Sequence, residues 1–215
     1  MNTAVPPQKD FEPGSGISGG CAILVAGIPA AGKTRFACWL GSAWQLPCLS
    51  KDGVKELLFD QLGFESRRQK VALGAAAQAV LLDFAARQLE AQNSFILENN
   101  FEDSSIQPLT QLLDRYGCRA VTVRFGGDIE VLYHRFIARD KSPQRHRGHV
   151  VNAVYPEVGP PPPYVPMGLA AFTAGVQTRG FDRFAVRGPV IPVDCTDFAQ
   201  VDYKEIARKI KEVLG

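Results

Sequence analysis

The first strongly apolar stretch of the chain, CAILVA at residues 21–26, runs straight into a loop that contains two glycines. Six consecutive apolar residues before a glycine are typical of a strand that is buried on both faces. The residues after the loop, KTRFACWLGSAW, place apolar side chains at helical spacing and predict a helix over 33–44. The first elements that the sequence predicts are therefore a strand, a loop and a helix.

The same alternation continues through most of the chain. Four further apolar runs, LPCLS, SFILEN, RAVTVRF and PVIPVDC, predict strands. Between and after them, helices are predicted over 51–63, 67–92, 103–117 and 128–140, and from about residue 201 to the end. Strands that alternate with helices predict an α/β fold, a three-layer sandwich with a mostly parallel sheet of about five strands.

Two of these helices show a recognisable apolar face. In the long helix, residues at spacings of three and four predict one shared face: Val71, Ala75, Gln78, Leu82, Ala85 and Leu89. In the last helix the predicted apolar face consists of Tyr203, Ile206, Ala207, Ile210 and Leu214. Both helices are therefore expected to cover the sheet.

Regular periodicity weakens after residue 140. The stretch KSPQRHRGHVVNAVYPEVGPPPPYVP contains prolines, arginines and histidines with little repeat, and an irregular segment of this length in a compact domain is usually functional. We expect a lid and acceptor-site region over about 140–185. The proline-rich part, 156–166, is expected to shape the acceptor pocket; the alternative is a ligand for a proline-binding domain.

Composition and charge narrow the class of protein. The chain has 215 residues and a formal net charge of +2, which is too small to predict a nucleic-acid surface, so no stable nucleic-acid partner is expected. The apolar runs are too short to span a bilayer, and residues 1–20 lack the pattern of a secretory signal. We expect a flexible leader over 1–20, a single domain over 21–215 and a cytoplasmic protein without a membrane partner.

The loop between the first strand and helix carries the first chemical signal. GIPAAGKT, residues 27–34, fits the phosphate-binding pattern G-x-x-x-x-G-K-[ST] and has the required strand before it and helix after it. Lys33 is expected to reach the β- and γ-phosphates, and the Thr34 hydroxyl to ligate Mg²⁺. The expected nucleotide-binding residues are Gly27, Ile28, Pro29, Ala30, Ala31, Gly32, Lys33, Thr34 and Arg35.

Asp52 follows the second predicted strand, at the carboxyl edge of the sheet near the phosphate loop. A carboxylate there can accept the proton of an acceptor hydroxyl; the alternative is that Asp52 is a helix N-cap. Lys55, one turn later, is expected to hold the acceptor or a phosphate, unless it belongs to a solvated helix face.

Glu98 ends the third predicted strand, after four apolar residues and before Asn99. A carboxylate in such surroundings is costly to bury unless it is paired. It is expected to hold a Mg²⁺-bound water or a substrate hydroxyl, with Asn99 also on the substrate side. A strand-end acid bonded to a neighbouring loop is the alternative.

The stretch HRFIARDKSPQRHRGH concentrates arginines at the start of the irregular region. We interpret it as a lid in which Arg135, Arg139 and Arg145 balance the charge of a transferred phosphoryl group. Arg135 and Arg139 are four residues apart on one helix, so both are expected to point at one target. The alternative is a solvated charged face.

With these parts assembled, the chain resembles the small P-loop kinases, a group that includes polynucleotide 5′-kinases, chloramphenicol phosphotransferase and the zeta toxins. The resemblance covers about residues 21–150 and depends on LVAGIPAAGKT, SKDGVKELL, FILENNF and the arginine-rich stretch. It implies that Asp52 is the base toward the acceptor hydroxyl. It also implies a basic residue three positions later, often arginine, where this chain has Lys55.

The expected function is therefore ATP-dependent transfer of the γ-phosphoryl group to a hydroxyl or phosphate of a small molecule or nucleotide, with ATP and Mg²⁺ as cofactors. The catalytic set is Lys33, Asp52, Arg135, Arg139 and Arg145. A nucleotide-dependent regulatory ATPase and a toxin-like kinase with an antitoxin partner are the alternatives. The protein is expected to be a monomer or homodimer.

Overall fold

The computed structural model describes residues 19–160 and 163–215, so the predicted leader lies almost entirely outside the described residues. In the described part, five strands form one sheet in which every neighbouring pair is parallel, in the order β2-β3-β1-β4-β5. The strands are β1 (Cys21–Gly27), β2 (Cys48–Ser50), β3 (Phe95–Glu98), β4 (Arg119–Gly126) and β5 (Val190–Asp194). The predicted α/β class and parallel sheet are confirmed.

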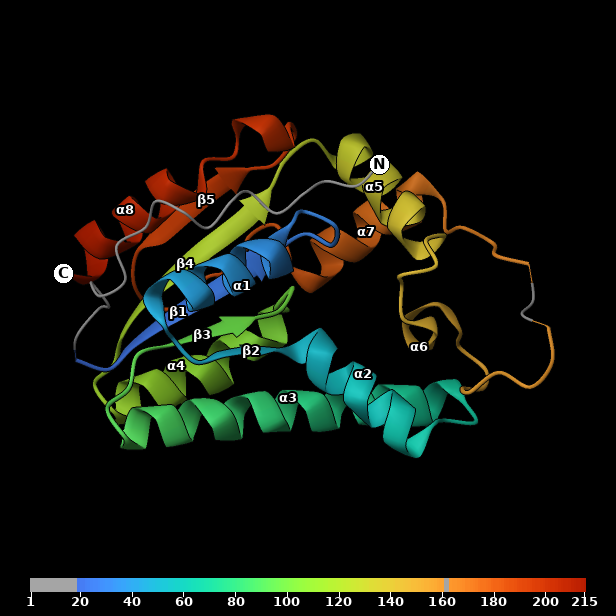
Figure 1. The fold of residues 1–215 in the computed structure, drawn as a ribbon, viewed down its shortest axis with the longest axis horizontal. Helices are drawn as coiled ribbons and strands as arrows, with labels where there is room; N and C mark the ends of the chain where they lie inside the picture. Colours follow the sequence, from blue (N-terminus) through green and yellow to red (C-terminus); the bar gives the residue numbers. More distant parts are fainter. Residues whose placement is uncertain (1–18, 161–162) are drawn as a thin grey trace.

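Helices connect consecutive strands, as parallel pairing requires. They are α1 (Lys33–Trp44), α2 (Lys51–Leu62), α3 (Arg67–Glu90), α4 (Ile106–Arg115), α5 (Ile129–Asp140), α6 (Arg147–Val150), α7 (Leu169–Arg179) and α8 (Tyr203–Leu214). Two 3₁₀ turns, η1 (Asp103–Ser105) and η2 (Phe198–Gln200), complete the described elements. Figure 1 shows α1 and α8 over one face of the sheet and α3 with α4 over the other.

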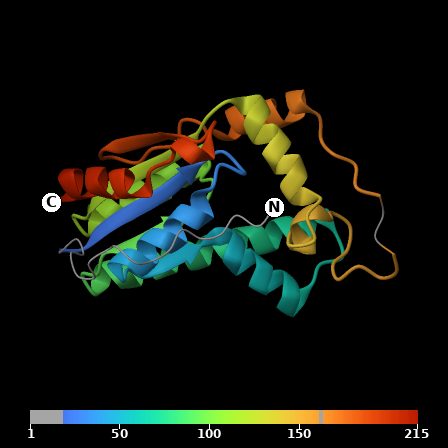
Figure 2. The same cartoon turned by 45° about the horizontal axis from the view of Figure 1, so that its top comes forward.

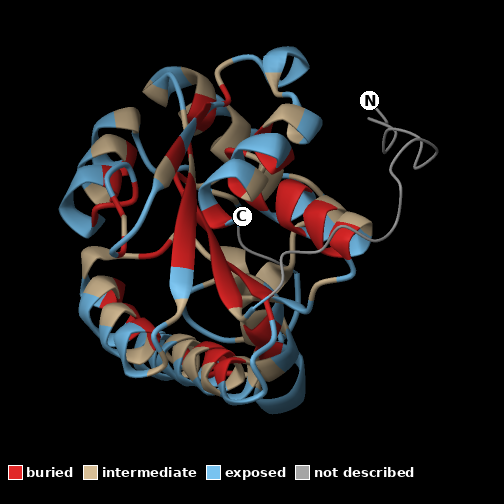
Figure 3. Cartoon of the chain, turned by 90° about the vertical axis from the view of Figure 1, so that its left-hand side faces the viewer, coloured by how far each residue is buried: buried red, intermediate tan, exposed pale blue. Residues whose placement is uncertain are grey.

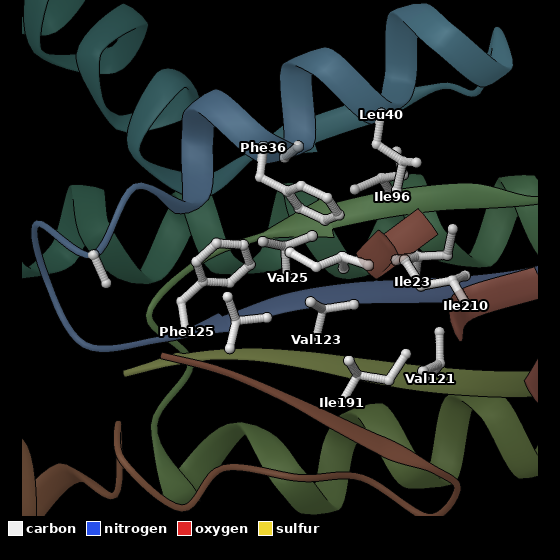
Figure 4. Close-up of a cluster of buried hydrophobic side chains, with 14 of the residues drawn as sticks. Ile23, Val25, Phe36, Leu40, Ile96, Val121, Val123, Phe125, Ile191 and Ile210 are labelled. Carbon is white, nitrogen blue, oxygen red and sulfur yellow. The ribbon is translucent and has the colours of Figure 1, made fainter. Parts of the chain in front are cut away.

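The sheet is buried on both faces because its central strand is apolar throughout. All seven residues of β1 are buried. Ile23 and Val25 face α1 and α8, where they join a core that includes Phe36 and Phe125 (Figure 4). Leu24 points to the opposite core, under α3 and α4. The buried strands run through the middle of the molecule between partly exposed helices (Figure 3), which is the predicted three-layer arrangement.

The predicted face of α8 is confirmed at Ile206, Ala207, Ile210 and Leu214, which are buried. The predicted face of α3 is partly wrong, because Val71 is 58% exposed. The buried residues of this helix are Lys70, Ala77, Leu81, Ala85 and Leu89. Alanine on nearly every side of α3 makes its apolar period ambiguous, so the contact face depends on where the sheet lies.

Helix α7 was not predicted. Phe172 and Val176, four residues apart, are buried against α5 and the core, and Gly180 ends the helix in the left-handed conformation. Gly168 and Gly175 interrupt the apolar pattern of this short helix, so the sequence did not predict it. In the ranges 19–160 and 163–215, no helix combines the length and apolar character needed to cross a membrane.

Candidate active site

The phosphate loop leaves β1 through a backbone conformation that requires glycine. Gly27 has φ 125°, and a Cβ there would clash with the carbonyl oxygen of Phe125 on β4. Gly32 has φ 89° and caps the N-terminus of α1. The N–H groups in the first turn of α1 therefore face the loop, where a helix N-terminus attracts phosphate oxygens.

Lys33 lies across this loop. Its Nζ donates to the carbonyl oxygen of Ile28 at 2.7 Å, and the residue is only 5% exposed. Burial lowers the pKa of Lys33 to about 8, and Glu98 opposes part of that shift. A lysine with so little solvent and one carbonyl partner gains a better environment when an anion enters the loop.

Three hydroxyl and carboxylate groups meet beside the loop. Glu98, at the end of β3, accepts hydrogen bonds from Ser50 Oγ at 2.6 Å and from Thr34 Oγ1 at 3.2 Å. Glu98 is 5% exposed, and burial raises the pKa of its carboxyl group although Lys33 opposes the rise. Hard oxygen donors of this kind suit Mg²⁺. Thr34 and Glu98 thus lie together, next to the loop, as a metal-binding role requires.

Asp52 lies in the first turn of α2, not at the end of β2, which stops at Ser50. Ser50 is the N-cap of this helix, and its Oγ accepts from Gly53 N at 3.4 Å, so the N-cap alternative for Asp52 is not what the structure has. Burial alone would raise the pKa of Asp52. His149, Lys55 and Arg145 more than offset it and lower that pKa, so the carboxylate is ionised at neutral pH.

Arg139 and Arg145 both lie close to Asp140, at the end of α5. The distances from their Nε atoms to Asp140 Oδ1 are 3.7 and 3.4 Å. Among the described residues these three atoms are buried and make no well-aligned hydrogen bond. Arg139 is also close enough to Lys33 to lower the pKa of that lysine. Its guanidinium group therefore lies on the same side of the molecule as the phosphate loop.

Arg135 lies elsewhere, so the expectation that it shares a target with Arg139 is wrong. Its guanidinium donates to the carbonyl oxygens of Cys195 and Thr196, the latter at 2.8 Å. The same group stacks on the ring of Phe198 at 3.8 Å. These contacts join α5 to the segment after β5. Arg135 and Arg139 therefore contact different neighbours although they lie on the same helix.

The irregular region that follows α5 is attached to α2 and α3. Phe64 and Tyr155 exchange two backbone hydrogen bonds of 2.7 Å each. His146 Nε2 lies 2.9 Å from Asp60 Oδ1, and the Tyr155 hydroxyl donates to the same oxygen at 2.7 Å. Phe59 packs among the rings of this cluster. Figures 1 and 2 show α6 lying against α2, so the expected lid is joined to the helix that carries Asp52.

The remaining predicted residues fall on the side of α2 and α3. Lys55 Nζ lies 3.8 Å from Asp52 Oδ1 and 5.6 Å from the centre of the Phe59 ring. Asn99 Nδ2 donates to Gln78 Oε1 at 3.4 Å, which ties the end of β3 to α3. Lys55 is thus beside Asp52, whereas Asn99 makes contacts that hold the scaffold.

A cavity of about 700 Å³ that the sequence patterns did not predict opens at the other side of the loop. Its walls are Gly32, Arg35 and Trp39 from the loop and α1, together with residues 198–204. A Cβ on Gly32 would lie 3.1 Å from the Phe198 ring. Phe198, in the stretch DFAQVDY after the last strand, is the residue in the sequence that could have indicated this cavity. A flat ring beside the phosphate loop is suited to stacking on a nucleobase.

The chain is similar to known proteins in family and fold. The family model AAA_33, described as an AAA domain, matches residues 23–156. Among solved structures, the chain is similar to a candidate kinase from Chloroflexus aurantiacus, with 29% identity, a TM-score of 0.73, and coverage of 91% of this chain and 98% of that one. No curated protein matches the chain.

Two more distant structures share the fold. Kti12 from Chaetomium thermophilum, solved in complex with ADP-AlF3, has 16% identity and a TM-score of 0.56, with 90% of this chain and 99% of that chain covered. A gluconokinase from Sinorhizobium meliloti has 16% identity and a TM-score of 0.50, with 92% and 93% covered. Because the family match spans more than half of the chain, the protein belongs to the AAA_33 family of AAA domains and is a small P-loop kinase-like protein.

Proposed function

We propose that this protein is an ATP-dependent phosphotransferase that moves the γ-phosphoryl group to a hydroxyl or phosphate group of a small molecule or nucleotide. One observation carries the assignment: Asp52, in the first turn of α2, has a carboxylate that interacts with Lys33 of the phosphate loop and with Arg139 and Arg145 at the end of α5 and just after it. A nucleotide-binding domain that only switches conformation has no need of a base at this position. The family and the kinase-like neighbours support nucleotide-dependent phosphoryl transfer in general.

In this proposal the triphosphate lies along the loop and the first turn of α1. Lys33 exchanges its contact with the Ile28 carbonyl oxygen for the β- and γ-phosphates. The base occupies the cavity beside Phe198, the ring on which Arg135 stacks. This arrangement moves Arg135 from the phosphoryl-transfer set to the nucleotide-binding set.

Thr34 and Glu98 would hold Mg²⁺, Thr34 directly and Glu98 through a water molecule, because both offer oxygen atoms beside the loop. When bound, the ion neutralises charge on the β- and γ-phosphates. Ser50 keeps its hydrogen bond to Glu98 and holds that carboxylate in place.

The acceptor oxygen attacks the γ-phosphorus, the bond from that phosphorus to the bridging oxygen of ADP breaks, and the hydroxyl proton passes to an Asp52 carboxylate oxygen. A weakly basic carboxylate suits this role, because the proton is lost late in a loose phosphoryl-transfer transition state. Arg139 balances the charge of the transferred group, and Arg145 approaches from the segment after α5. The segment attached to α2 limits access of water to the acceptor side.

The test is release of ADP from Mg²⁺-ATP in the presence of a panel of hydroxyl compounds, nucleosides and nucleotides. We expect acceptor-dependent release, lowered by at least about a hundredfold in Lys33→Ala and in Asp52→Asn. Asp83→Asn is the matched control, since Asp83 is an exposed residue of α3 paired with Arg87. Turnover that needs no acceptor and ignores Asp52→Asn would instead identify a regulatory ATPase.

A further inference from the structure

Lys70 is a buried lysine of α3 that the proposed reaction does not use. The residue is 9% exposed, and its Nζ donates three hydrogen bonds: to the carbonyl oxygens of His149 and Val151 at 2.9 and 2.5 Å, and to Asn152 Oδ1 at 3.1 Å. Burial lowers the pKa of Lys70 to about 8, so the ammonium form predominates at pH 7. An ammonium group has three donors, and all of them are used within one short segment.

The segment that Lys70 contacts includes the end of α6, a helix of four residues. The last carbonyl groups of a helix have no partner within it. The Lys70 ammonium group supplies such a partner from another element, because it contacts the carbonyl oxygen of His149 in the last turn of α6. Arg67, three residues before Lys70, donates to Asn152 Oδ1 at 2.7 Å. Two cations of α3 therefore attach residues 149–152 to that helix.

The same segment contacts α2 on its other side, and α6 lies beside α2 in both cartoon views (Figures 1 and 2). A Cβ at Gly148 would lie 2.4 Å from the Phe59 ring, so the chain passes this buried ring very closely. His149 Nε2 lies 2.9 Å from Glu56 Oε1. Glu56 follows Asp52 by four residues, and residues at this spacing lie on one face of a helix. His149 is thus bonded to the face of α2 that carries Asp52.

We propose that Lys70 is a positioning residue for the acceptor side of the site: its three hydrogen bonds hold residues 149–152 on α3 and thereby keep His149 on the face of α2 that carries Asp52. The inference rests on the proposed function. Lys70 acts through the segment, because its three donors are already occupied there. Without the ammonium group two carbonyl oxygens lose their partner on α3, and the segment can leave α2.

The imidazole of His149 reports whether the segment is in place. Burial lowers the pKa of His149 to about 3, from its ordinary value of 6.5. The charged and titratable groups that face it are Asp52, Lys55 and Glu56 of α2 and Arg145 and His146 of its own segment. Once the segment leaves α2 and α3, the imidazole regains water and its pKa returns toward 6.5.

The chain has three histidines, so NMR of the imidazole signals follows His149 directly once His149→Gln has assigned it. The experiment compares the wild type with Lys70→Met, which keeps most of the side-chain length and removes the donors, over about pH 5 to 8. We expect a constant His149 signal in the wild type and titration near 6.5 in Lys70→Met. Lys209→Met, on the exposed face of α8, is the matched control and should behave as the wild type. A His149 signal that stays constant in folded Lys70→Met would overturn the inference.

Turnover separates positioning from a general loss of structure. Lys70→Met should lower acceptor-dependent kcat about tenfold or more, because a small displacement near the reacting groups is costly. The KM of ATP should be unchanged, since the contacts of Lys70 lie on the segment after α5 and not on the phosphate loop. Lys70→Arg, which retains a cation with several donors, should recover most of the lost kcat. An unchanged kcat in Lys70→Met, or a KM of ATP that rises as kcat falls, would contradict a positioning role.

Two exposed residues keep the inference testable if Lys70→Met does not fold. Asn152→Ala combined with Arg67→Gln weakens the same attachment and leaves the buried lysine in place. This double variant should shift the titration of His149 and the acceptor-dependent kcat in the same directions, and wild-type values of both would overturn the inference. If the wild type transfers phosphate to no acceptor, the proposed function fails, and the His149 titration alone then decides whether Lys70 positions the segment.

Discussion

Raising the pH from about 7 to about 9 should weaken nucleotide binding, because Lys33 loses its proton over that range. Burial lowers the pKa of Lys33 to about 8, below its ordinary value of 10.5. A triphosphate favours the charged lysine, so the pKa rises again in the complex and binding takes up a proton. Nucleotide affinity is therefore greatest below pH 8 and falls as the pH rises through 8.

The size of the effect follows from the fraction of protonated lysine. With a pKa of about 8, roughly nine tenths of Lys33 is protonated at pH 7 and roughly one tenth at pH 9, a loss of affinity of about tenfold. The stability of the free protein responds in the opposite sense. The cost of burying a charged Lys33 is present below pH 8 and disappears as the pH rises from about 8 to 10.5.

Calorimetric titration with ADP, in buffers of different ionisation enthalpy, measures both affinity and proton uptake. We expect about half a proton taken up per nucleotide at pH 8 and nearly one at pH 9. Lys33→Met should bind more weakly and lose the slope. Lys70→Arg should keep it, because that variant removes the other lysine of the described residues with a pKa of about 8 but leaves the loop intact. A flat profile in the wild type, or a slope that persists in Lys33→Met, would refute the reasoning.

Three further predictions concern the loop, the base cavity and the segment attached to α2. Gly27→Ala should cost about 2 to 4 kcal/mol in urea unfolding, since its Cβ would meet a β4 carbonyl oxygen, whereas Gly175→Ala, with open space around it, should be neutral or stabilising. Equal stability of the two variants would contradict the geometry. Phe198→Ala should raise the KM of ATP roughly tenfold with little change in kcat, and an unchanged KM would remove the base from this cavity. Phe59→Ala, which removes a fully buried ring, should cost about 3 to 5 kcal/mol and speed proteolysis within 146–157, with Mg²⁺-ATP slowing it; cleavage at the wild-type rate would mean that this cluster does not hold the segment.

Most of the fold could be predicted because the strands are apolar on both faces. The apolar residues before Gly27 and before Glu98 predict buried strands, and a glycine loop between strand and helix then places the nucleotide site at the carboxyl edge of the sheet. Lys33, Thr34 and Glu98 could be brought together on that basis alone. The apolar pattern of the strands and the parallel topology of the sheet were sufficient to predict that these three residues lie close together.

The other half depends on contacts between distant parts of the chain. Lys70 lies within the helix predicted over 67–92 but outside its predicted apolar face, and its Nζ donates to the carbonyl oxygen of His149, 79 residues later. Arg135 and Arg139 are four residues apart on a helix, a spacing that predicts one shared target. Arg135 instead donates to carbonyl oxygens of the segment after β5. Neither the Lys70 contact nor the Arg135 contact can be predicted from the periodicity of apolar residues. Both depend on how segments without a regular sequence repeat pack on α2, α3 and the sheet edge.

The account is tested most directly by a crystal structure with Mg²⁺ and a non-hydrolysable ATP analogue. It predicts the terminal phosphate in the loop, Lys33 Nζ moved from the Ile28 carbonyl oxygen to phosphate oxygens, and the Asp52 carboxylate facing the γ-phosphorus. Between them there should be room for an acceptor oxygen about 3 to 3.5 Å from that phosphorus. A nucleotide bound with Asp52 turned away, and packed side chains filling the intervening space, would contradict phosphoryl transfer at this site.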